Sequence, residues 1–429
     1  MASAVRPRAT AATTAAHHAP GRARPRRIAA SAATSQSALA SRVAGLKNEG
    51  AYAVLAAAQA LEAQGRDVVH LEIGQPAYPT PDHVVEAGVA ALRGGQTKYS
   101  APAGVAALRD AIAAHVNATR GLDGAQAVSG ANVVVGPGAK PGIFAAALAL
   151  VEPGDEVVYP DPGFPSYGAA VDVCAGVHVS VALTADGAGF DMDALEAAMS
   201  ERTKLIIANS PGNPTGGVMP AVDVRRMCEL AKKYDAWVIS DEIYSRLVYD
   251  SAEGACLSPL AVEGMAERTV MVDGFSKTYC MTGWRLGWAV APAALAERME
   301  LLNVHNYGCT ATFTQAAGLA ALEGPQDSLE EMRAEYERRR DFVVGALNAM
   351  EGVHCPEPAG AFYAFPDTSA LGMKSADLAS LLLQEGGVAL LPGTDFGAQG
   401  EGKLRLSYVS SMAELEEGLT RMEKVLRGL

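Results

Sequence analysis

The sequence predicts an α/β fold: a large domain built on a mostly parallel, doubly wound sheet, plus a smaller α+β domain formed by the N- and C-terminal parts of the chain. Two observations support this. Between about residues 140 and 290, short apolar runs alternate with turns and helical stretches, which is typical of a sheet covered by helices on both faces. Beyond about residue 320, long charged helical stretches surround short strands. We expect the large domain to span 86–320 and the small domain to combine 37–85 with 321–429.

The size and the charge of the chain limit the classes of protein to which it can belong. The chain has 429 residues, of which 49% are hydrophobic and 19% charged, with a formal net charge of −13. This is the composition of a folded protein of two or three domains. A surface so acidic repels nucleic acid, and no Cys/His finger offsets it, so we expect no nucleic-acid partner. No apolar run reaches the 18 residues that a membrane span requires.

The first 36 residues differ from the rest. They hold six arginines and no acidic residue, and Glu49 is the first carboxylate of the chain. Arg-rich, Ser-containing, acid-free N-termini are typical of organellar transit peptides. We therefore expect residues 1–36 to be a disordered transit peptide. The Ala/Ser/Pro bias favours a chloroplast, with a mitochondrion or a merely disordered tail as the alternatives.

The N-terminal segment after this leader predicts one helix and one strand. From Ser41 to Gly65, apolar side chains recur among Ala, Gln and Glu, and Gly65 closes the helix. The run Val68–Ile73 predicts a strand that leads into a proline-punctuated loop.

The central region predicts the sheet. Its expected strands are Val133–Val135, Glu156–Tyr159, Val177–Val181, Lys204–Ile207, Trp237–Ile239 and Val270–Val272. Helical stretches lie between several of them, at Ile143–Val151, Asp191–Met199 and Val222–Tyr234. In the C-terminal part we expect helices over Ser328–Met350 and Glu414–Leu429, with strands at Ala361–Pro366 and Leu404–Tyr408.

Cysteine and histidine spacing indicates no metal. The chain has six cysteines and eight histidines, without C-x-x-C or H-x-x-x-H patterns. We expect reduced, mostly buried thiols and no structural or catalytic metal.

Polar residues gather where the predicted strands end. The segments are Gly136–Lys140, Asn209–Gly217, Asp241–Tyr244, and Gly274–Lys277 followed by Arg285. In open α/β sheets, ligands bind at the carboxyl ends of the strands. One lysine, one aspartate, one asparagine, one tyrosine and one arginine are therefore expected at the same rim.

Each of these groups has a chemical use. A glycine-rich strand-to-helix turn suits a phosphate, and Arg285 could hold that phosphate bidentately. The glycine spacing matches neither the dinucleotide fingerprint nor the Walker pattern. A buried aspartate would keep a heteroaromatic nitrogen protonated, and a lysine in an apolar site can form an imine. Phosphate, pyridinium partner and imine lysine together indicate pyridoxal phosphate.

The chain resembles class I/II aminotransferases of pyridoxal-phosphate fold type I, and in particular the aspartate/prephenate aminotransferase branch. The resemblance runs from about Ser41 to the C-terminus and includes nine segments in order. They are LEIGQP (71–76), KYSAPAG (98–104), GAK (138–140), NPTG (213–216), SDEIY (240–244), GFSK (274–277), MTGWRLG (281–287), GAFY (360–363) and LRLSY (404–408).

The resemblance implies a role for each site residue. Lys277 would form the imine with pyridoxal 5'-phosphate and move the proton. Asp241 would pair with the pyridine nitrogen, while Tyr244 and Asn213 would bind the ring oxygen. The phosphate would be held by Gly138, Ala139, Lys140, Ser276 and Arg285, with Tyr99 reaching it from the partner of a homodimer. Phe164 would stack on the ring, and Gly74, Asn213 and Arg405 would take the substrate's α-carboxylate.

The resemblance also implies the reaction, a ping-pong transfer of an amino group between an L-amino acid and a 2-oxo acid such as 2-oxoglutarate. Aspartate is the first candidate for the L-amino acid. Relatives of the branch carry a Tyr-Trp pair where this chain has Gly163 and Phe164, and no residue is assigned to a second carboxylate. Neutral or aromatic donors (alanine, phenylalanine, tyrosine, kynurenine) therefore stay open as alternatives. So does a lyase on the same cofactor. We disfavour a DNA-binding regulator, for which residues 1–36 leave no room, and a scaffold that has lost its catalytic groups.

Overall fold

The computed structural model describes residues 40–46, 48–249 and 256–429. The chain divides into two units, Met1–Ala40 and Ser41–Leu429, and only Ala40 of the first unit is among the described residues. The predicted transit peptide, residues 1–36, lies outside them. Within the described ranges, no helix combines the length and the apolar character needed to cross a bilayer.

The second unit is built around a sheet with seven strands in the described part of the chain, in the order β2-β8-β7-β6-β5-β3-β4. The strands are β2 Val133–Gly136, β3 Glu156–Asp161, β4 Val177–Ala182, β5 Thr203–Asn209, β6 Trp237–Asp241, β7 Thr269–Gly274 and β8 Gly287–Val290. Strands β4, β3, β5, β6 and β7 run parallel to one another, whereas β8 is antiparallel to both β7 and β2. The predicted sheet, mostly parallel, is confirmed.

Alternate side chains of each strand enter different cores, as the two-residue period of a strand requires. Leu205 and Ile207 of β5 pack on one face, which α5, α6 and α10 cover, while Ile206 packs on the other, covered by α4, α11, α7 and α8. Helix α3 packs on α11. The bounds are α3 Asp82–Arg93, α4 Ala106–Arg120, α5 Lys140–Leu150, α6 Ser166–Cys174, α7 Met192–Ala198, α8 Ala221–Lys233, α10 Ala293–Asn306 and α11 Thr312–Glu323.

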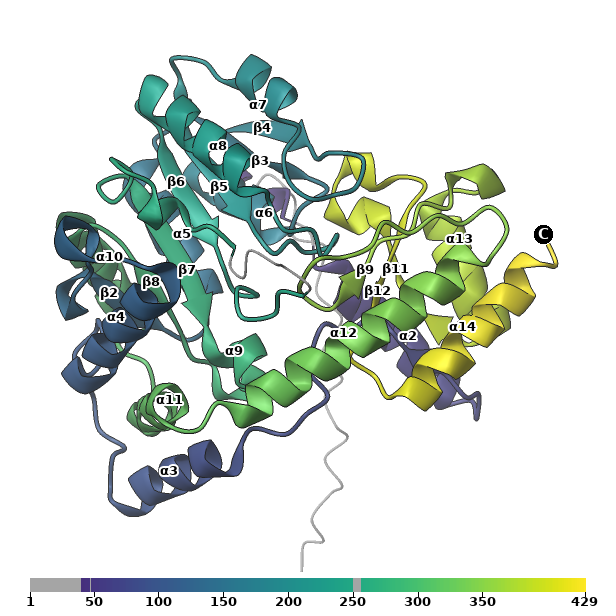
Figure 1. Cartoon of the computed structure of the whole chain (residues 1–429), viewed down its shortest axis with the longest axis horizontal. Helices are drawn as coiled ribbons and strands as arrows, with labels where there is room; N and C mark the ends of the chain where they lie inside the picture. The colour runs from purple at the N-terminus through teal and green to yellow at the C-terminus, as the bar shows by residue number, and fades with distance from the viewer. Residues whose placement is uncertain (1–39, 47, 250–255) are drawn as a thin grey trace, which may run out of the picture. The chain divides into compact units, whose positions relative to one another are not determined.

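The C-terminal elements form a smaller layer beside this sheet, and the N-terminal segment joins them (Figure 1). Strands β11, β12 and β9 make an antiparallel sheet, and β1 pairs in parallel with β10. Leu61 of α2 shares a core with Leu383 and Ala389. The bounds are α2 Gly50–Glu62, β1 Val69–His70, α12 Asp327–Asn348, β9 Tyr363–Ala364, α13 Ser375–Leu381, β10 Val388–Ala389, β11 Leu391–Pro392, β12 Leu404–Ser407 and α14 Met412–Leu426. The predicted domain limits stay predictions.

Some elements of the structure differ from the expected ones. The helix predicted over Ser41–Gly65 is two helices, α1 Ser41–Ala44 and α2, because Glu49 takes an extended conformation with φ −67° and ψ 127°. The strand predicted over Val68–Ile73 is shortened to β1. Strand β8 was not predicted, because its four residues, all buried, follow a short reversal of the chain instead of a crossover helix.

All six cysteines are free thiols, and four of them are buried, which confirms the expectation of reduced, mostly buried thiols. In the part of the chain that the structure describes, no group of three or more His, Cys, Asp and Glu side chains could hold a metal ion.

Candidate active site

Residues from distant parts of the chain meet where β5, β6 and β7 end. From the large sheet come Asn213, Asp241, Tyr244 and Lys277, and from the small sheet come Tyr363 on β9 and Arg405 on β12. Two hydrogen bonds join the groups: Tyr244 to Tyr363 at 2.8 Å, and Arg405 to Asn213 at 3.2 Å. The carboxyl edge of the parallel strands is therefore closed by the small sheet, as expected for a ligand site in this fold class.

Lys277 lies on the short helix α9, Phe275–Thr278, which follows β7 directly. Its Nζ donates a hydrogen bond to the carbonyl of Gly74 at 2.5 Å. The same atom lies 5.9 Å from the ring centre of Tyr244 and 5.6 Å from that of Phe362. Burial, reinforced by the positive charge of Arg405, lowers the pKa of Lys277 to about 8. A sizeable fraction of this amine is therefore unprotonated near neutral pH, as a nucleophile or a base requires.

Asp241 is the last residue of β6 and is 5% exposed. Its carboxylate accepts a hydrogen bond from the Tyr167 hydroxyl at 2.8 Å and one from the backbone N–H of Ile243 at 3.3 Å. Among the described residues, no lysine, arginine or histidine nitrogen lies within the 4.0 Å of an ion pair with it. Burial raises the pKa of Asp241 to about 6. A cationic group of a ligand would stabilise this isolated carboxylate.

A buried ionic cluster stands behind Asp241. The guanidinium of Arg120 donates to Glu242 at 2.7 Å and to Asp273 at 3.2 Å, and all three side chains are at most 4% exposed. Glu242 follows Asp241 at the end of β6, and Asp273 is the penultimate residue of β7. One arginine therefore ties together the ends of the two strands that carry Asp241 and lead to Lys277. Burial raises the pKa of Asp273 to about 7.

The turn from β2 into α5 is shaped for an anion. Gly138 has a φ of +104°, which L side chains rarely adopt, and a Cβ there would lie 2.6 Å from Nη2 of Arg285. The first backbone N–H groups of a helix have no partner within it. The N–H groups of Ala139 and Lys140, at the start of α5, therefore suit a phosphate.

Two side chains from the β7–β8 connection complete this cradle. Ser276 is buried on α9. Arg285 is exposed, and its guanidinium donates to the carbonyl oxygens of Thr282 at 2.8 Å and Pro137 at 3.1 Å. No carboxylate among the described residues pairs with Arg285, so its charge is left for a ligand anion.

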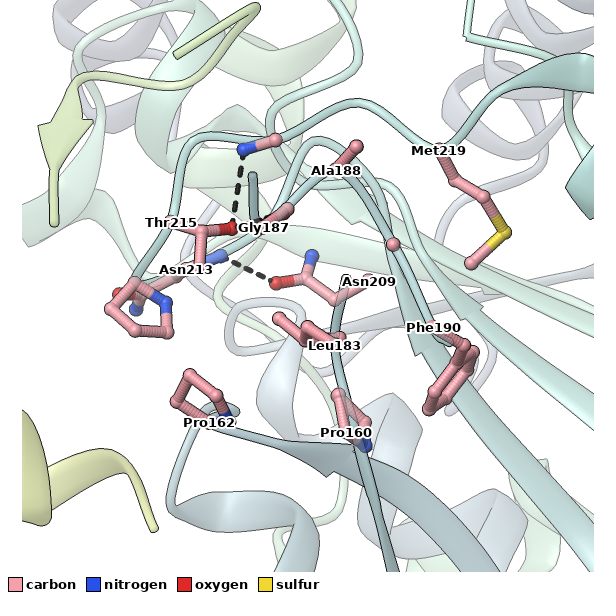
Figure 2. A pocket seen from close by; sticks show the side chains of 14 residues that line it. Pro160, Pro162, Leu183, Gly187, Ala188, Phe190, Asn209, Asn213, Thr215 and Met219 are labelled. Carbon is pink, nitrogen blue, oxygen red and sulfur yellow. Dashed lines mark hydrogen bonds between the residues drawn. The ribbon is translucent and has the colours of Figure 1, made fainter. Parts of the chain in front are cut away.

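Asn213 lies in the loop after β5 and is held in position by the side chain of a second asparagine, Asn209. The side-chain oxygen of Asn209 accepts the N–H of Asn213 at 2.9 Å, as Figure 2 shows, and its amide donates to the carbonyl of Asp241 at 2.9 Å. Thr215 braces the same loop by accepting the N–H of Gly217 at 3.2 Å. The pocket drawn in Figure 2 has a cavity volume of about 20 Å³, which suits a water molecule and is too small for an amino acid.

Arg405 is 4% exposed on β12. Its guanidinium donates to the side-chain oxygen of Asn213 at 3.2 Å and to the carbonyl of Glu72, and it lies 4.5 Å from the ring centre of Tyr363 and 5.0 Å from that of Phe396. Its Nε has no hydrogen-bond partner, and no described carboxylate forms an ion pair with it. Burial lowers the pKa of Arg405. A buried arginine without a counter-charge fits an incoming carboxylate.

Tyr363 is a site residue that the sequence analysis missed. It is 2% exposed, and its hydroxyl is hydrogen-bonded to that of Tyr244. It also packs on Gly74 so closely that a Cβ there would lie 2.0 Å from the Tyr363 hydroxyl. Tyr167, the partner of Asp241, was missed as well. The GAFY segment was the available signal for Tyr363, but only the folded chain shows that it meets Tyr244.

The remaining predicted residues differ in their placement. Phe164 is half-buried, with its ring centre 5.7 Å from that of Tyr167. Nζ of Lys140 lies 5.0 Å over the Phe164 ring and forms an ion pair with Glu49. Tyr99 lies between α3 and α4 with 95% of its surface exposed, and no other predicted site residue is hydrogen-bonded to it in the described part of the chain.

Taken together, a buried lysine of lowered pKa, a buried carboxylate without a cation and an anion-binding helix start define a pyridoxal-phosphate enzyme on a doubly wound sheet. Residues 66–422 match the model of the family described as aminotransferase class I and II. The chain belongs to this family and is a pyridoxal-phosphate-dependent aminotransferase.

Individual relatives with this activity support the assignment to the aminotransferase family. The aspartate/prephenate aminotransferase of Cereibacter sphaeroides is 38% identical over 405 residues, 91% of this chain and 99% of that protein. The aromatic-amino-acid aminotransferase 2 of Thermococcus litoralis is 37% identical over 369 residues, 85% of this chain and 93% of that protein. The solved aspartate aminotransferase from Thermus thermophilus with maleate is 37% identical, with a TM-score of 0.85 over 90% of this chain and 99% of that one.

The residues present fit the cofactor of this family. The unpaired carboxylate of Asp241 suits the pyridine nitrogen, and the amine of Lys277 suits the carbonyl carbon. Gly138 leaves room beside Arg285 that any side chain at that position would fill, as a bound phosphate requires.

Proposed function

We propose that this aminotransferase takes its amino group from an L-amino acid and passes it to a 2-oxo acid such as 2-oxoglutarate in a ping-pong sequence. Aspartate is the first candidate for the amino donor. The observation that carries the proposal is Arg405, a buried guanidinium with an unpaired Nε and no carboxylate partner among the described residues. A substrate α-carboxylate would satisfy it bidentately. Asn213 is hydrogen-bonded to Arg405 at 3.2 Å, and the carbonyl of Gly74 accepts a hydrogen bond from Lys277.

The chain's own residues would divide the chemistry as follows. When bound, pyridoxal phosphate supplies a carbonyl that condenses with amines and a ring that accepts electrons. Lys277, with its lowered pKa, would take the proton from the substrate Cα and deliver it to the carbonyl carbon of the cofactor. Asp241 holds the proton on the ring nitrogen, and Tyr244 orients the ring through its hydroxyl. Arg405 fixes the α-carboxylate, so the Cα–H bond stays close to Lys277.

The test is an absorbance spectrum of the cofactor-loaded protein before and after single amino acids are added. Aspartate, glutamate, alanine, phenylalanine, tyrosine, methionine and kynurenine form the panel. We expect aspartate and glutamate to convert the bound cofactor to its amine form, and 2-oxoglutarate to restore the starting spectrum. If no donor changes the spectrum of the loaded protein, the proposed function is wrong.

A second candidate is transfer from neutral or aromatic donors. It is favoured by the half-buried aromatic side chain of Phe164 at the site and by the name of the Thermococcus relative. Conversion of the bound cofactor by phenylalanine or tyrosine, but not by aspartate, would select it. Release of ammonia in the same assay would indicate a lyase.

We also propose that the protein works as a homodimer with shared active sites. Two observations support this. Tyr99 is 95% exposed although it is a large aromatic residue, and Arg285 is exposed beside the phosphate cradle. A tyrosine from a second copy would cover such a cradle. Light scattering of the purified protein at several concentrations tests the oligomeric state.

For the leader we propose import into the chloroplast, with the mitochondrion as the alternative. The support is the arginine-rich, acid-free composition of residues 1–36. Fusing this segment to a fluorescent protein tests the proposal in plant cells. Fluorescence that stays diffuse in the cytosol would contradict it.

A further inference from the structure

The exposed Tyr99 lies in a segment, residues 96–105, whose backbone is held firmly against its own chain. This segment joins α3 to α4. The N–H of Val135, on the edge strand β2, donates to the carbonyl of Ala103 at 2.9 Å. The N–H of Ala103 in turn donates to the carboxylate of Glu300 on α10 at 3.3 Å. The backbone of the segment is therefore fixed, whereas the side chain of Tyr99 is 95% exposed.

Gln315, in the first turn of α11, is the buried group that holds this segment. Its side chain is 0% exposed. Its Oε1 accepts the N–H of Val105 at 2.8 Å, and its Nε2 donates to the hydroxyl of Ser100 at 3.1 Å and to the carbonyl of Thr310 at 2.8 Å. A glutamine amide has two N–H donors, so both are used. The approach is close, because a Cβ at Gly104 would lie 3.2 Å from Oε1 of Gln315.

A second residue of α11 holds the segment on the other side of Tyr99. The hydroxyl of Thr312 donates to the carbonyl of Gln96 at 2.5 Å. Thr312 and Gln315 are three residues apart, so they share one face of the helix. Ordering a backbone costs conformational entropy. If Tyr99 binds the cofactor phosphate of a second copy, a segment that is already ordered loses less entropy when the cofactor binds.

We propose that Gln315 is a positioning residue that acts on the partner's cofactor site, by holding the segment that presents Tyr99. This inference rests on the proposed homodimer with shared active sites. An effect on its own chain is the competing explanation, because Thr310 lines a cavity of about 570 Å³ together with Arg285. Two of the three hydrogen bonds of Gln315 go to the segment of Tyr99, which favours an action on the partner.

The test places the same two substitutions, Gln315→Met and Lys277→Ala, in two arrangements of a hybrid dimer. The hybrids are isolated through a different affinity tag on each chain. In the first arrangement each chain carries one substitution, so the remaining Lys277 receives Tyr99 from a chain with an intact Gln315. In the second arrangement one chain carries both substitutions, so the remaining Lys277 receives Tyr99 from the chain that lacks Gln315.

The readout is the occupancy of the remaining site at increasing concentrations of pyridoxal phosphate. Borohydride reduction attaches the cofactor covalently to Lys277, and mass spectrometry of the Lys277 peptide counts that site alone. We expect the first arrangement to stay within about twofold of a hybrid with Lys277→Ala alone. The second should need about threefold to tenfold more cofactor for half occupancy, because hydrogen bonds that preorganise Tyr99 are lost.

Three other results would overturn the inference. An equal loss of affinity in both arrangements would show that Gln315 supports only the fold. A loss in the first arrangement alone would show that it acts on its own chain. No loss in either would show that it has no part in cofactor binding.

Two further variants keep the test decisive. Ser100→Ala removes one bond of Gln315 from a half-buried residue, and should produce the same difference between arrangements at about twofold. It decides alone if Gln315→Met does not form dimers. Gln326→Met is the matched control, because its Nε2 donates to the carbonyls of Ala321 and Gly324, both at 2.9 Å, at the other end of α11. It should show no difference between the arrangements.

Tyr99→Ala, placed in the same two arrangements, separates this inference from the proposed dimer. If the arrangement makes no difference for Tyr99→Ala, the proposal of shared active sites is wrong. If the arrangement matters for Tyr99→Ala but not for Gln315→Met, only the role of Gln315 is wrong.

Discussion

At the scale of single residues, the site consists of charges that the protein buries without pairing them. Asp241 has no cationic partner among the described residues, and Arg405 has no anionic one. Leaving such groups unpaired in a low-dielectric interior is costly. The arrangement is explained if ligands supply the missing charges, the cofactor for Asp241 and the substrate for Arg405.

Replacing Arg405 with lysine tests this explanation. Lysine keeps the positive charge but loses the planar fork that pairs with a carboxylate. We expect KM for the amino donor to rise about a hundredfold, equivalent to a loss of about 2–3 kcal/mol, while kcat changes less. Arg421→Lys, at an exposed ion pair on α14, is the control. Steady-state kinetics with one donor decide, and a KM within threefold of the original would contradict the role of Arg405.

The amine of Lys277 makes a second residue-level prediction. Its pKa is lowered to about 8 by burial, whereas a solvated lysine titrates near 10.4. In the cofactor-free protein, we expect labelling of Lys277 by a pulse of acetic anhydride to rise with pH and level off above a midpoint near 8. Mass spectrometry of the labelled peptides measures this, with surface lysines as internal controls. A midpoint near 10 would show that Lys277 is solvated.

The sequence was sufficient to predict site residues that lie within motifs. It was insufficient to predict residues whose place at the site depends on contacts between distant parts of the chain. Lys277, Asp241 and Arg285 stand beside expected strand ends, so their clustering could be anticipated, whereas the role of Arg405 followed from the family resemblance. Glu49 could not, because its contact with Lys140 spans 91 residues and follows from a break inside a segment whose periodicity indicates one continuous helix. The break between α1 and α2 therefore gives Glu49 a contact that the sequence analysis did not predict.

At the scale of elements, the site depends on short connections after the strands. Strand β8 shows how such a connection escapes prediction. Its four residues run antiparallel between β7 and β2, and alternation of strands and helices gives no signal for a strand that returns without a crossover helix. Yet β8 brings Gly287 against the turn before α5, where a Cβ would lie 2.6 Å from the N of Ala139. The reversal that sequence reasoning missed is what supports the phosphate cradle.

Gly138→Ala tests the cradle. Alanine at a φ of +104° is strained, and its Cβ would lie 2.6 Å from Arg285, so the turn must open. We expect the affinity for pyridoxal phosphate to fall at least about tenfold, since strain of this kind costs about 1–3 kcal/mol. Gly95→Ala is the matched control, because its φ is +75° but its Cβ would meet nothing within 4 Å. Fluorescence titration of both variants with the cofactor decides, and equal effects would mean that backbone strain alone is responsible.

The buried cluster behind Asp241 links two elements. Arg120→Met removes the cation that neutralises Glu242 and Asp273, which are at most 3% exposed. Removing one partner from a buried ion pair costs about 3–5 kcal/mol. We therefore expect a clear fall in the unfolding free energy at pH 8, smaller at pH 6, where Asp273, with a pKa raised to about 7, is more often neutral. Denaturant titration at the two pH values measures this, and a loss of stability independent of pH would contradict it.

At the scale of the whole molecule, the question is whether each site is completed by a second copy. Variants at Tyr99 and Lys277 distinguish a site completed by the partner from a site built by one chain alone. Lys277→Ala inactivates the site of its own chain, and Tyr99→Ala weakens whichever site Tyr99 serves. If Tyr99 serves the partner, a hybrid of the two variants contains one intact site, with Lys277 from one chain and Tyr99 from the other. If it serves its own chain, the hybrid contains none.

Mixing the variants in equal amounts under conditions that exchange subunits should then yield about half hybrid dimers, and so about a quarter of the unmodified activity per chain. Each variant taken alone through the same procedure sets the background. Recovery above both backgrounds requires two copies per site, and the exposed Tyr99 then has its explanation. No recovery, in a sample shown by mass spectrometry to contain hybrids, would mean that each chain builds its site alone and that the cradle beside Arg285 is covered from within.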